Sequence, residues 1–375
     1  MISFESLELY FKHVWKSLPI YKKLLFNYLP IKLLIQKWDI PEKLNVKCLF
    51  IQSMDREDYN KFTNIIFHTI ELDDKDFLLI QKKKKLNFDF LSIGYSDIRN
   101  IWNSLETKNI VEKIYIVLNI LQVKSIDKYL KGYNLKLLIA HADMQPVENY
   151  MVQYFKEKGI KTVTLQHGLY IDYSKYPNIN EVNYKNVVSD YFLSWGEETK
   201  ELIEKYHSNC KVLLCGNPTE KEMAYKSKDF FTVVFDQELF KEYNKKLIHI
   251  AQELSRKINL KILLKPHPRN NLNDYDLDKD LFIDNGSLNN SAFVLGHTTT
   301  MMFQLMRSGI PVFKYQTDIP SNKFNNDLIF SNINELMLKL EKKDQIDYIK
   351  EGKYYIKYID NNSLEKYKEV IERLI

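Results

Sequence analysis

The segment Leu263-Leu264-Lys265-Pro266-His267-Pro268-Arg269 is an apolar run that leads directly into a basic tip bounded by prolines. A second segment, from Ala292 to Leu295, leads in the same way into Gly296-His297-Thr298-Thr299-Thr300 and then into an apolar helical stretch. Short apolar runs that end in polar turns are typical of buried strands in a parallel sheet. Both segments therefore favour an α/β fold.

Around these two segments, apolar runs alternate with stretches of helical periodicity, the pattern of βαβ units. Before Pro218 we expect strands at 135–140, 162–166, 191–195 and 211–215, with helices at 147–158 and 197–206. After Pro218 we expect strands at 231–235, 261–265, 281–283, 292–295 and 310–313, with helices at 238–258 and 300–308. The pattern predicts two Rossmann-like domains.

The stretch 216–229 separates the two series, so we expect an N-terminal domain at 1–218 and a C-terminal domain at 219–375. The last helix, 363–374, is a candidate to fold back on the first domain. The N-terminal third is less regular, with strands expected at 46–52 and 88–93 and a helix at 110–121. The charge run Lys82–Lys85 predicts a solvated turn.

Bulk properties restrict the class of protein. The chain has 375 residues, 45% of them hydrophobic, and its 54 basic residues exceed its 49 acidic residues by only five, which argues against a nucleic-acid groove. Cys48, Cys210 and Cys215 form neither an even disulfide set nor a zinc spacing, so we expect core thiols in a reducing cytoplasm. No apolar run is long enough to span a bilayer, and the N-terminus lacks the layout of a signal peptide.

One segment near the N-terminus suggests a membrane surface. Residues 11–38 interleave lysines with tryptophan, tyrosine and leucine, a composition that suits peripheral contact with an anionic membrane face. A pair of ordinary amphipathic helices broken at Pro19 and Pro30 explains the same pattern equally well. Both interpretations stay open.

The first candidate site is the basic tip after the strand at 261–265. Its two prolines fix the backbone that presents His267, and Lys265 and Arg269 stand close enough to hold negative charge. We expect a phosphate ligand here. The alternative is a rigid turn whose histidine only bonds a carbonyl group.

The second candidate is the turn that opens the helix at 300–308. Gly296 lets the chain turn after the strand, while Thr298 and Thr299 can offer hydroxyl and N–H groups to a diphosphate. As an alternative, either threonine is simply the N-cap of the helix, which is compatible with phosphate binding.

The third candidate lies in the first domain, where Gln166-His167-Gly168 follows an expected strand. A neutral histidine there suits a general base that takes a proton from an acceptor hydroxyl. Asp143, which also follows a strand, could orient His167, act as base itself, or cap the helix that Pro146 opens. Gly216 and Asn217 could approach a ligand or form a plain hinge turn.

Several familiar site types are missing from the sequence. It has no serine elbow, no Walker glycine–lysine loop, no Gly-x-Gly-x-x-Gly and no zinc-type spacing of His and Cys. Asp276, Asp278 and Asp280 form an alternating acidic motif, but they stand in a polar loop with no strand leading in, so we interpret them as a solvated turn. We expect neither a metal nor another cofactor.

Five short motifs, taken in order, resemble those of bacterial GT-B glycosyltransferases of capsule, exopolysaccharide and teichoic-acid synthesis. They are Gln166-His167-Gly168, Gly216-Asn217-Pro218, Lys265-Pro266-His267-Pro268, Gly296-His297-Thr298-Thr299 and Ser308-Gly309-Ile310-Pro311. The chain is similar in particular to CDP-glycerol-dependent teichoic-acid polymerases and to capsular Kdo and sialic-acid transferases. The resemblance covers roughly residues 135 to 315.

The resemblance implies a GT-B fold, two Rossmann-like domains facing across a cleft, that works without a metal. It implies that His167 is catalytic, that His267 meets the donor phosphate, and that Thr298 and Thr299 replace paired hydroxyl residues at the same phosphates. The expected partners are a CMP-, UDP- or CDP-linked donor and an oligosaccharide or lipid-linked acceptor. The expected location is the cytoplasm, including the inner face of the membrane.

Three other functions stay open at this point. The same residues could serve transfer of a CDP-linked polyol phosphate, with attack at phosphorus rather than carbon. A sugar-nucleotide epimerase is disfavoured because the sequence shows no suitable acidic pair. A non-catalytic nucleotide-sugar-binding subunit of a polysaccharide complex is the alternative outside enzymes.

Overall fold

The fold divides into two compact units in a computed structural model that describes residues 2–17, 36–39, 46–53, 56–69, 77–84, 95–172, 181–221, 230–268, 270–319 and 324–375. The first unit comprises residues 1–194, 199–218 and 361–375, and the second comprises 195–198 and 219–360. The last helix therefore belongs to the first unit, although the chain before it runs through the second.

The first unit is built on a seven-stranded sheet with strand order β1-β3-β2-β4-β5-β6-β7. Its strands are β1 (Gln36–Asp39), β2 (Cys48–Gln52), β3 (Phe77–Lys84), β4 (Leu137–Ala140), β5 (Lys161–Leu165), β6 (Tyr191–Ser194) and β7 (Lys211–Leu214). Among the strand pairs formed by the described residues, only the edge pair β1 and β3 is antiparallel. The central strands are buried on both faces, which is why they appear in the sequence as continuous apolar runs.

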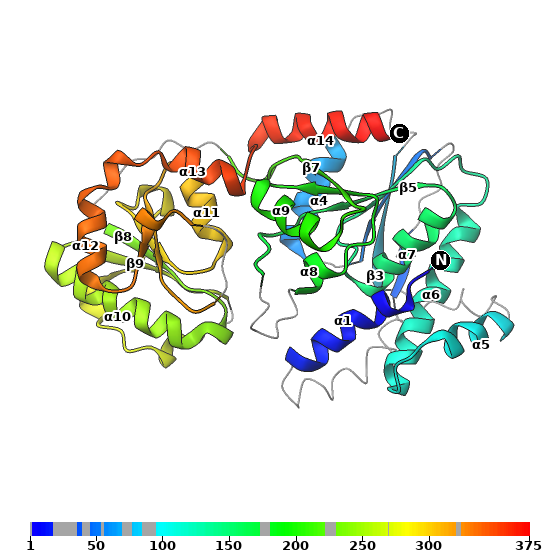
Figure 1. Cartoon of the computed structure of the whole chain (residues 1–375), viewed down its shortest axis with the longest axis horizontal. Coiled ribbons are helices and arrows are strands. Elements are labelled where there is room, and N and C mark those ends of the chain that lie inside the picture. The colour runs from blue at the N-terminus through cyan, green and yellow to red at the C-terminus, as the bar shows by residue number, and fades with distance from the viewer. Residues whose placement is uncertain are drawn as a thin grey trace. The chain divides into compact units, whose positions relative to one another are not determined.

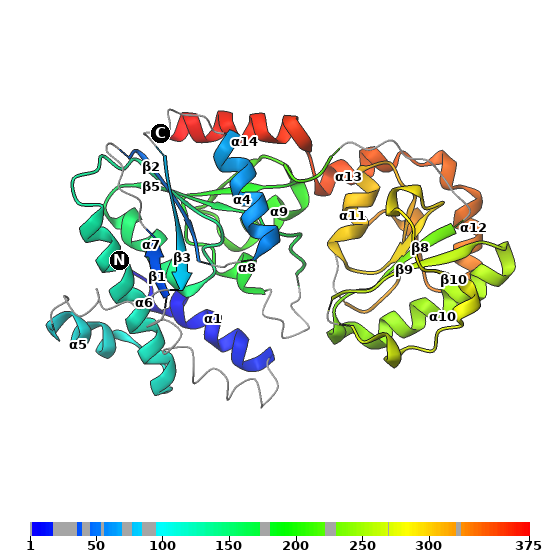
Figure 2. The ribbon, with the colours of Figure 1, turned by 180° about the vertical axis from the view of Figure 1, so that it is seen from behind.

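Helices cover the faces of this sheet. They are α1 (Phe4–Ser17), α4 (Glu57–Thr69), α5 (Tyr95–Ser104), α6 (Ile110–Tyr129), α7 (Pro146–Glu157), α8 (Val182–Lys185), α9 (Glu197–Tyr206) and α14 (Asp360–Leu374). Helix α7 packs against both α1 and α6 (Figure 1). Helix α14 lies beside α4, where the rings of Phe62 and Tyr367 are 6.3 Å apart (Figure 2).

The second unit is a six-stranded parallel sheet with order β10-β9-β8-β11-β12-β13. Its strands are β8 (Phe230–Val234), β9 (Lys261–Lys265), β10 (Phe282–Ile283), β11 (Val294–Gly296), β12 (Val312–Tyr315) and β13 (Ile329–Phe330). Its helices are α10 (Lys241–Ile258), α11 (Thr300–Arg307), α12 (Ile333–Glu341) and α13 (Tyr348–Tyr355). Helix α10 ends at Asn259, which adopts the left-handed conformation of a C-cap.

The strands and helices expected between 135 and 315 are present, most of them within two residues of the expected bounds. The expected turn at Lys82–Lys85 is wrong, because Lys82–Lys84 forms the end of β3 and pairs with β1. Such an edge strand is difficult to recognise in a sequence, because its lysines lower the local hydropathy. Lysines are common there because they hinder pairing of the edge with a further strand. The strand expected at 88–93 lies outside the described residues, as does most of the basic, aromatic segment 11–38.

The three cysteines are buried and free, as expected for core thiols. In the part of the chain that the structure describes, no helix combines the length and apolar character needed to cross a bilayer.

Candidate functional site

Two sets of polar side chains stand at the carboxyl ends of parallel strands, one set in each unit. Loops and helix N-termini converge at this end of a parallel sheet, so ligands of open α/β sheets bind there. In the first unit the neighbouring strands β2, β4 and β5 lead into Ser53, His141 and Gln166-His167. In the second unit the corresponding polar side chains stand at the carboxyl ends of β9, β8, β11 and β12.

His167 stands half-buried at the end of β5, in an aromatic setting. Its Nδ1 is 3.0 Å from the hydroxyl of Tyr170, and its ring centre is 5.4 Å from that of Tyr59. Burial lowers the pKa of His167 to about 4, assisted by the Arg56 guanidinium and opposed by a hydrogen bond to the backbone of Leu165. The imidazole is therefore neutral at physiological pH and able to accept a proton.

The Gln166 side chain fixes the loop that carries this histidine. Its Nε2 donates to the carbonyl of Gly168 at 2.8 Å and to the hydroxyl of Thr199 at 3.0 Å. Its Oε1 accepts from the Ser194 hydroxyl at 3.3 Å. Gln166 is thus a positioning residue. In the Gln-His-Gly motif, the glutamine side chain fixes the loop that carries the His167 ring.

Asp143 lies in a different environment from the one that a partner of His167 would need. Its Oδ2 accepts hydrogen bonds from the backbone of Val188 at 2.9 Å and from the backbone and hydroxyl of Ser189 at 3.0 and 2.8 Å. Burial raises the pKa of Asp143, and these three donors oppose that effect. No hydrogen bond joins Asp143 to His167 in the described part of the chain, so its contacts are those of a structural anchor.

A second histidine, His141 at the end of β4, lies beside His167. The two rings are 5.6 Å apart, and the Tyr59 ring lies 4.6 Å from His141. The Nδ1 of His141 is 3.1 Å from the hydroxyl of Thr63, whereas its buried Nε2 has no hydrogen-bond partner among the described residues. Burial holds the pKa of His141 well below its usual range, with the charge of His167 acting in the same direction.

Glu148 is a buried carboxyl group that the sequence does not single out. From the first turn of α7 it accepts hydrogen bonds from the backbone and hydroxyl of Ser53, both at 2.6 Å, and from the backbone of Ala142 at 2.7 Å. Burial raises its pKa to about 7. The side chain therefore ties the loops after β2 and β4 together.

In the second unit, Lys265 ends β9 as an exposed residue and His267 follows it half-buried, with its carbonyl accepting from the backbone N–H of Asn270 at 2.9 Å. The Nδ2 of Asn270 donates to the Asp236 carbonyl at 2.9 Å. Its buried Oδ1 has no hydrogen-bond partner among the described residues. Arg269, the third expected cation, lies outside the described residues.

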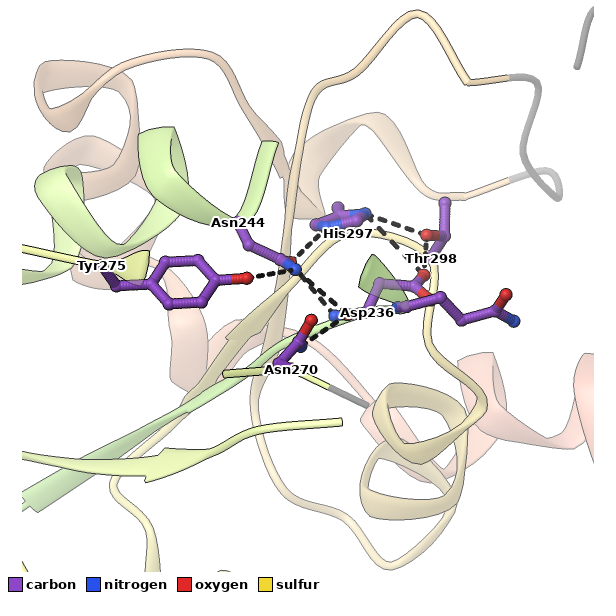
Figure 3. A network of polar contacts seen from close by, with 7 residues as sticks. Asp236, Asn244, Asn270, Tyr275, His297 and Thr298 are labelled. Carbon is purple, nitrogen blue, oxygen red and sulfur yellow. Dashed lines mark hydrogen bonds and ion pairs between the residues drawn. The ribbon is translucent and has the colours of Figure 1, made fainter. Parts of the chain in front are cut away.

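A buried polar network joins the ends of β8 and β11 (Figure 3). The Oγ1 of Thr298 contacts Oδ2 of Asp236 and lies 2.8 Å from Nδ1 of His297. The other ring nitrogen of His297 is 2.8 Å from Oδ1 of Asn244, on α10. The Thr298 hydroxyl is therefore engaged inside the protein.

Thr299 differs from Thr298. It is the N-cap of α11, it is half-buried, and its side chain makes no capping bond in the described structure. The first N–H groups of α11 consequently lack a side-chain acceptor from this position, an arrangement that suits an anion. Gly296 has a packing role, because a Cβ there would lie 2.6 Å from the sulfur of Met302 and 2.7 Å from Val234.

Lys314 is a buried cation that the sequence analysis missed. It pairs in register with Gly296 on the neighbouring strand, and burial lowers its pKa to about 8. Its ammonium lies 5.7 Å from the ring of Phe324 and contributes to lowering the pKa of His297. The signal was a lysine inside an otherwise apolar strand.

The surroundings of Gly216, Asn217 and the acidic motif at 276–280 are those of residues that support the fold. Gly216 has φ of 79°, a conformation that favours glycine, and its carbonyl accepts from the Tyr367 hydroxyl of α14 at 3.2 Å. Asn217 beside it is buried. In the acidic motif, Asp278 pairs with Arg256 at 2.7 Å, and the described residues contain no cluster of three or more metal-ligating side chains.

Comparison with solved structures identifies the fold. The chain is similar to a UDP-N-acetylglucosamine 2-epimerase from Rickettsia bellii, with 14% identity, a TM-score of 0.51, and coverage of 88% of this chain and 96% of that one. It is also similar to the lipopolysaccharide outer core galactosyltransferase WaaB, with 12% identity, a TM-score of 0.50, and coverage of 88% and 100%. Comparisons with protein-family models and with curated proteins find no match.

At such low identity these similarities establish architecture only. They confirm the expected α/β fold of the GT-B class, with two Rossmann-like units.

Proposed function

We propose that the chain is a glycosyltransferase that moves a sugar from a nucleotide-sugar donor to a saccharide hydroxyl during synthesis of a bacterial surface polysaccharide. The observation that carries the proposal is the position of His167 at the carboxyl edge of the first sheet, with the rings of Tyr59 and His141 beside it. The second unit separately provides an edge with cationic and hydroxyl side chains. A base and an anion-binding edge are the two requirements of this reaction.

The second unit is proposed to bind the donor. Lys265 ends β9 and His267 lies two residues beyond it, Lys314 is the third residue of β12, and the uncapped start of α11 lies between them in strand order. Cationic side chains and helix N–H groups stabilise the negative charge that develops on a departing nucleotide phosphate.

The first unit is proposed to activate the acceptor. A ring nitrogen of His167 takes the proton of the acceptor hydroxyl as the oxygen forms a bond to the anomeric carbon. The bond between that carbon and the nucleotide phosphate breaks, and its electron pair leaves with the phosphate. The low pKa of His167 keeps it unprotonated across the neutral range.

A product analysis tests this proposal. Purified chain is incubated in EDTA with CMP-, UDP- and CDP-linked sugars and an oligosaccharide acceptor, and the products are identified by mass spectrometry. We expect one donor to yield free nucleotide and an acceptor heavier by one sugar. An acceptor heavier by a polyol phosphate when CDP-glycerol is supplied would identify the phosphotransferase instead, and tight binding without turnover would identify a binding subunit.

The epimerase alternative has its own signature. Such an enzyme would convert the sugar while leaving the acceptor unchanged, and nuclear magnetic resonance of the recovered donor distinguishes the two stereoisomers. We expect no such conversion, because the buried carboxyl groups Asp143 and Glu148 are both engaged by backbone donors.

Location at the cytoplasmic face of the membrane is part of the same proposal, and it rests on the basic, aromatic composition of residues 11–38. Flotation of the full chain with vesicles that contain anionic lipid should carry the protein upward. Neutral vesicles are the control, and equal recovery with both would contradict membrane contact.

A further inference from the structure

The polar network around His297 makes more close contacts than its hydrogens can satisfy when Asp236 is an anion and the imidazole is neutral. Its members come from three places: Asp236 after β8, His297 and Thr298 after β11, and Asn244 on α10 (Figure 3). His297 and Asn244 are fully buried, while Asp236 and Thr298 are each 4% exposed. Buried polar atoms need partners within the protein, so each contact constrains where the protons lie.

The orientation of the Asn244 amide is fixed by two backbone groups. Its Oδ1 accepts from the N–H of Asp236 at 3.1 Å, and its Nδ2 donates to the carbonyl of Asp236 at 3.0 Å. Because a backbone N–H only donates and a carbonyl only accepts, the amide cannot be reversed. The Nε2 of His297, 2.8 Å from Oδ1, must therefore carry a hydrogen and donate it.

With Nε2 protonated, a neutral imidazole presents only a lone pair at Nδ1. That lone pair meets Oγ1 of Thr298, which also contacts Oδ2 of Asp236. The hydroxyl has one hydrogen for two acceptors if Asp236 is an anion. One of the two contacts would then bring lone pairs together inside the protein.

One additional proton satisfies every contact. In one arrangement His297 is cationic and donates through Nδ1 to Thr298, which donates to the Asp236 carboxylate. In the other, Asp236 is a neutral acid that donates to Thr298, which donates to Nδ1. The two differ only by a shift of protons along the chain of three residues, and both are electrically neutral overall.

We propose that Asp236, Thr298 and His297 hold one shared proton beyond those of an aspartate anion and a neutral imidazole, and that this neutral unit positions the turn into α11. The unit lies directly before Thr299 and the open N–H groups of the helix. If these groups bind the donor, a point that rests on the proposed function, the shared proton removes an anion that would repel the donor phosphate.

Charged and titratable side chains from neighbouring elements surround the network. Lys314 on β12 is the nearby cation, and it disfavours a cationic His297. The ring of Tyr243, on α10, lies 6.1 Å from His297. The hydroxyl of Tyr275, outside this helix, accepts a hydrogen bond from Asn244 at 3.4 Å. Burial lowers the pKa of His297 to about 4, and the neighbouring Asp236 opposes that effect.

Proton linkage gives the sign of the expected effect. Between about pH 4 and 6.5 the unfolded chain carries an aspartate anion and a protonated histidine, the same proton count as the folded network. Above about pH 6.5 the unfolded histidine is neutral, so unfolding releases the shared proton. Stability contributed by the unit is thus present at low pH and lost as pH rises.

The substitution Asp236→Asn tests this directly. Its amide can donate to Thr298 through Nδ2 and accept from the N–H of Gln237 through Oδ1, as Oδ1 of Asp236 does at 2.6 Å. The same contacts are then satisfied with no extra proton. The ratio of the wild-type unfolding equilibrium constant to that of the variant should rise tenfold per pH unit between pH 5 and 9. Denaturant unfolding measures both constants. Parallel profiles would overturn the proposal.

Two further measurements keep the result interpretable. Asp284→Asn, at an exposed carboxylate of the same unit, should leave the pH profile of the wild type unchanged. If Asp236→Asn fails to fold, the nuclear magnetic resonance signals of the wild-type His297 ring nitrogens decide instead. Two bound protons on His297, or one on Nε2 with a protonated Asp236 carboxyl signal, support the proposal, and an ionised carboxyl beside a neutral ring contradicts it.

A binding measurement separates this inference from the proposed function. At pH 7, CMP and UDP should bind Asp236→Asn within about threefold of the wild type, because both present a neutral unit. A large loss of affinity in this variant alone would contradict the positioning role. If neither protein binds a nucleotide, the proposed function fails while the unfolding profiles still decide whether the proton is held.

Discussion

The carboxyl edges of the two sheets share one strand-to-loop geometry but differ in chemistry. The edge in the first unit combines His141 and His167 with the Tyr59 ring, and it keeps both histidines neutral by burial. The edge in the second unit combines hydroxyl groups, lysines and an uncapped helix. The fold therefore determines where a site can form, while the loop residues determine whether that site takes a proton or holds an anion.

The largest effect expected from this difference is on turnover. Replacing His167 by Ala removes the proposed base, so kcat should fall by a factor of about 10² to 10⁴. His249→Ala, an exposed histidine of α10, is the matched control and should retain wild-type turnover. Retained turnover in the His167 variant would show that the first edge does not supply the base.

The next effect concerns the scaffold of the first edge. Glu148→Ala leaves the backbone N–H groups of Ser53 and Ala142 without their acceptor, so the free energy of unfolding should fall by about 3 to 5 kcal/mol. Glu157→Ala, exposed at the other end of α7, should change it by no more than about 0.5 kcal/mol. Denaturant unfolding measures both, and equal changes would mean that Glu148 ties no loops together.

Acid should affect the first edge through His167, whose folded pKa of about 4 lies below its ordinary value. A histidine with a depressed pKa takes up its proton on unfolding, so stability is lost as pH falls from about 6.5 to about 4, by at most about 3 kcal/mol over that interval. The variant His167→Asn should therefore lose less stability than the wild type over the same range. Identical acid profiles would show that burial does not depress this pKa.

The smallest effect is expected at the second edge. Lys314→Met keeps the length and apolar stem of the side chain but removes its charge, so nucleotide affinity should fall by roughly tenfold. Lys261→Met, at the amino end of β9 and far along the strand from the proposed site, is the control and should bind normally. Equal affinities for both variants would remove Lys314 from the donor site.

Much of the fold between 135 and 315 could be predicted because its strands are buried on both faces and bounded by turn residues. Strand β9 and helix α9 begin and end at the expected residues. The antiparallel pair β1 and β3 could not be predicted, because the paired end of β3 is a run of lysines without alternating apolar residues. Propensity and pattern describe local sequence, and an edge strand depends on its partner.

The site was predictable only in part. Motifs at strand ends correctly indicated where His167, His267 and the Thr298–Thr300 turn would stand. They did not indicate that Thr298 is engaged by Asp236, because 62 residues separate the two in sequence. They left open whether Asp143 orients His167, acts as a base or caps a helix, and the ring that approaches His167 belongs to His141, two residues before Asp143. Contacts between separate loops are tertiary information.

The division of labour between the two edges can be tested most directly by calorimetric titration of one donor nucleotide into the wild type, His167→Ala and His267→Ala. If the second edge alone holds the donor, His167→Ala should bind within about threefold of the wild type, whereas His267→Ala should bind at least about tenfold more weakly. Equal losses in the two variants, or a loss confined to His167→Ala, would contradict the account.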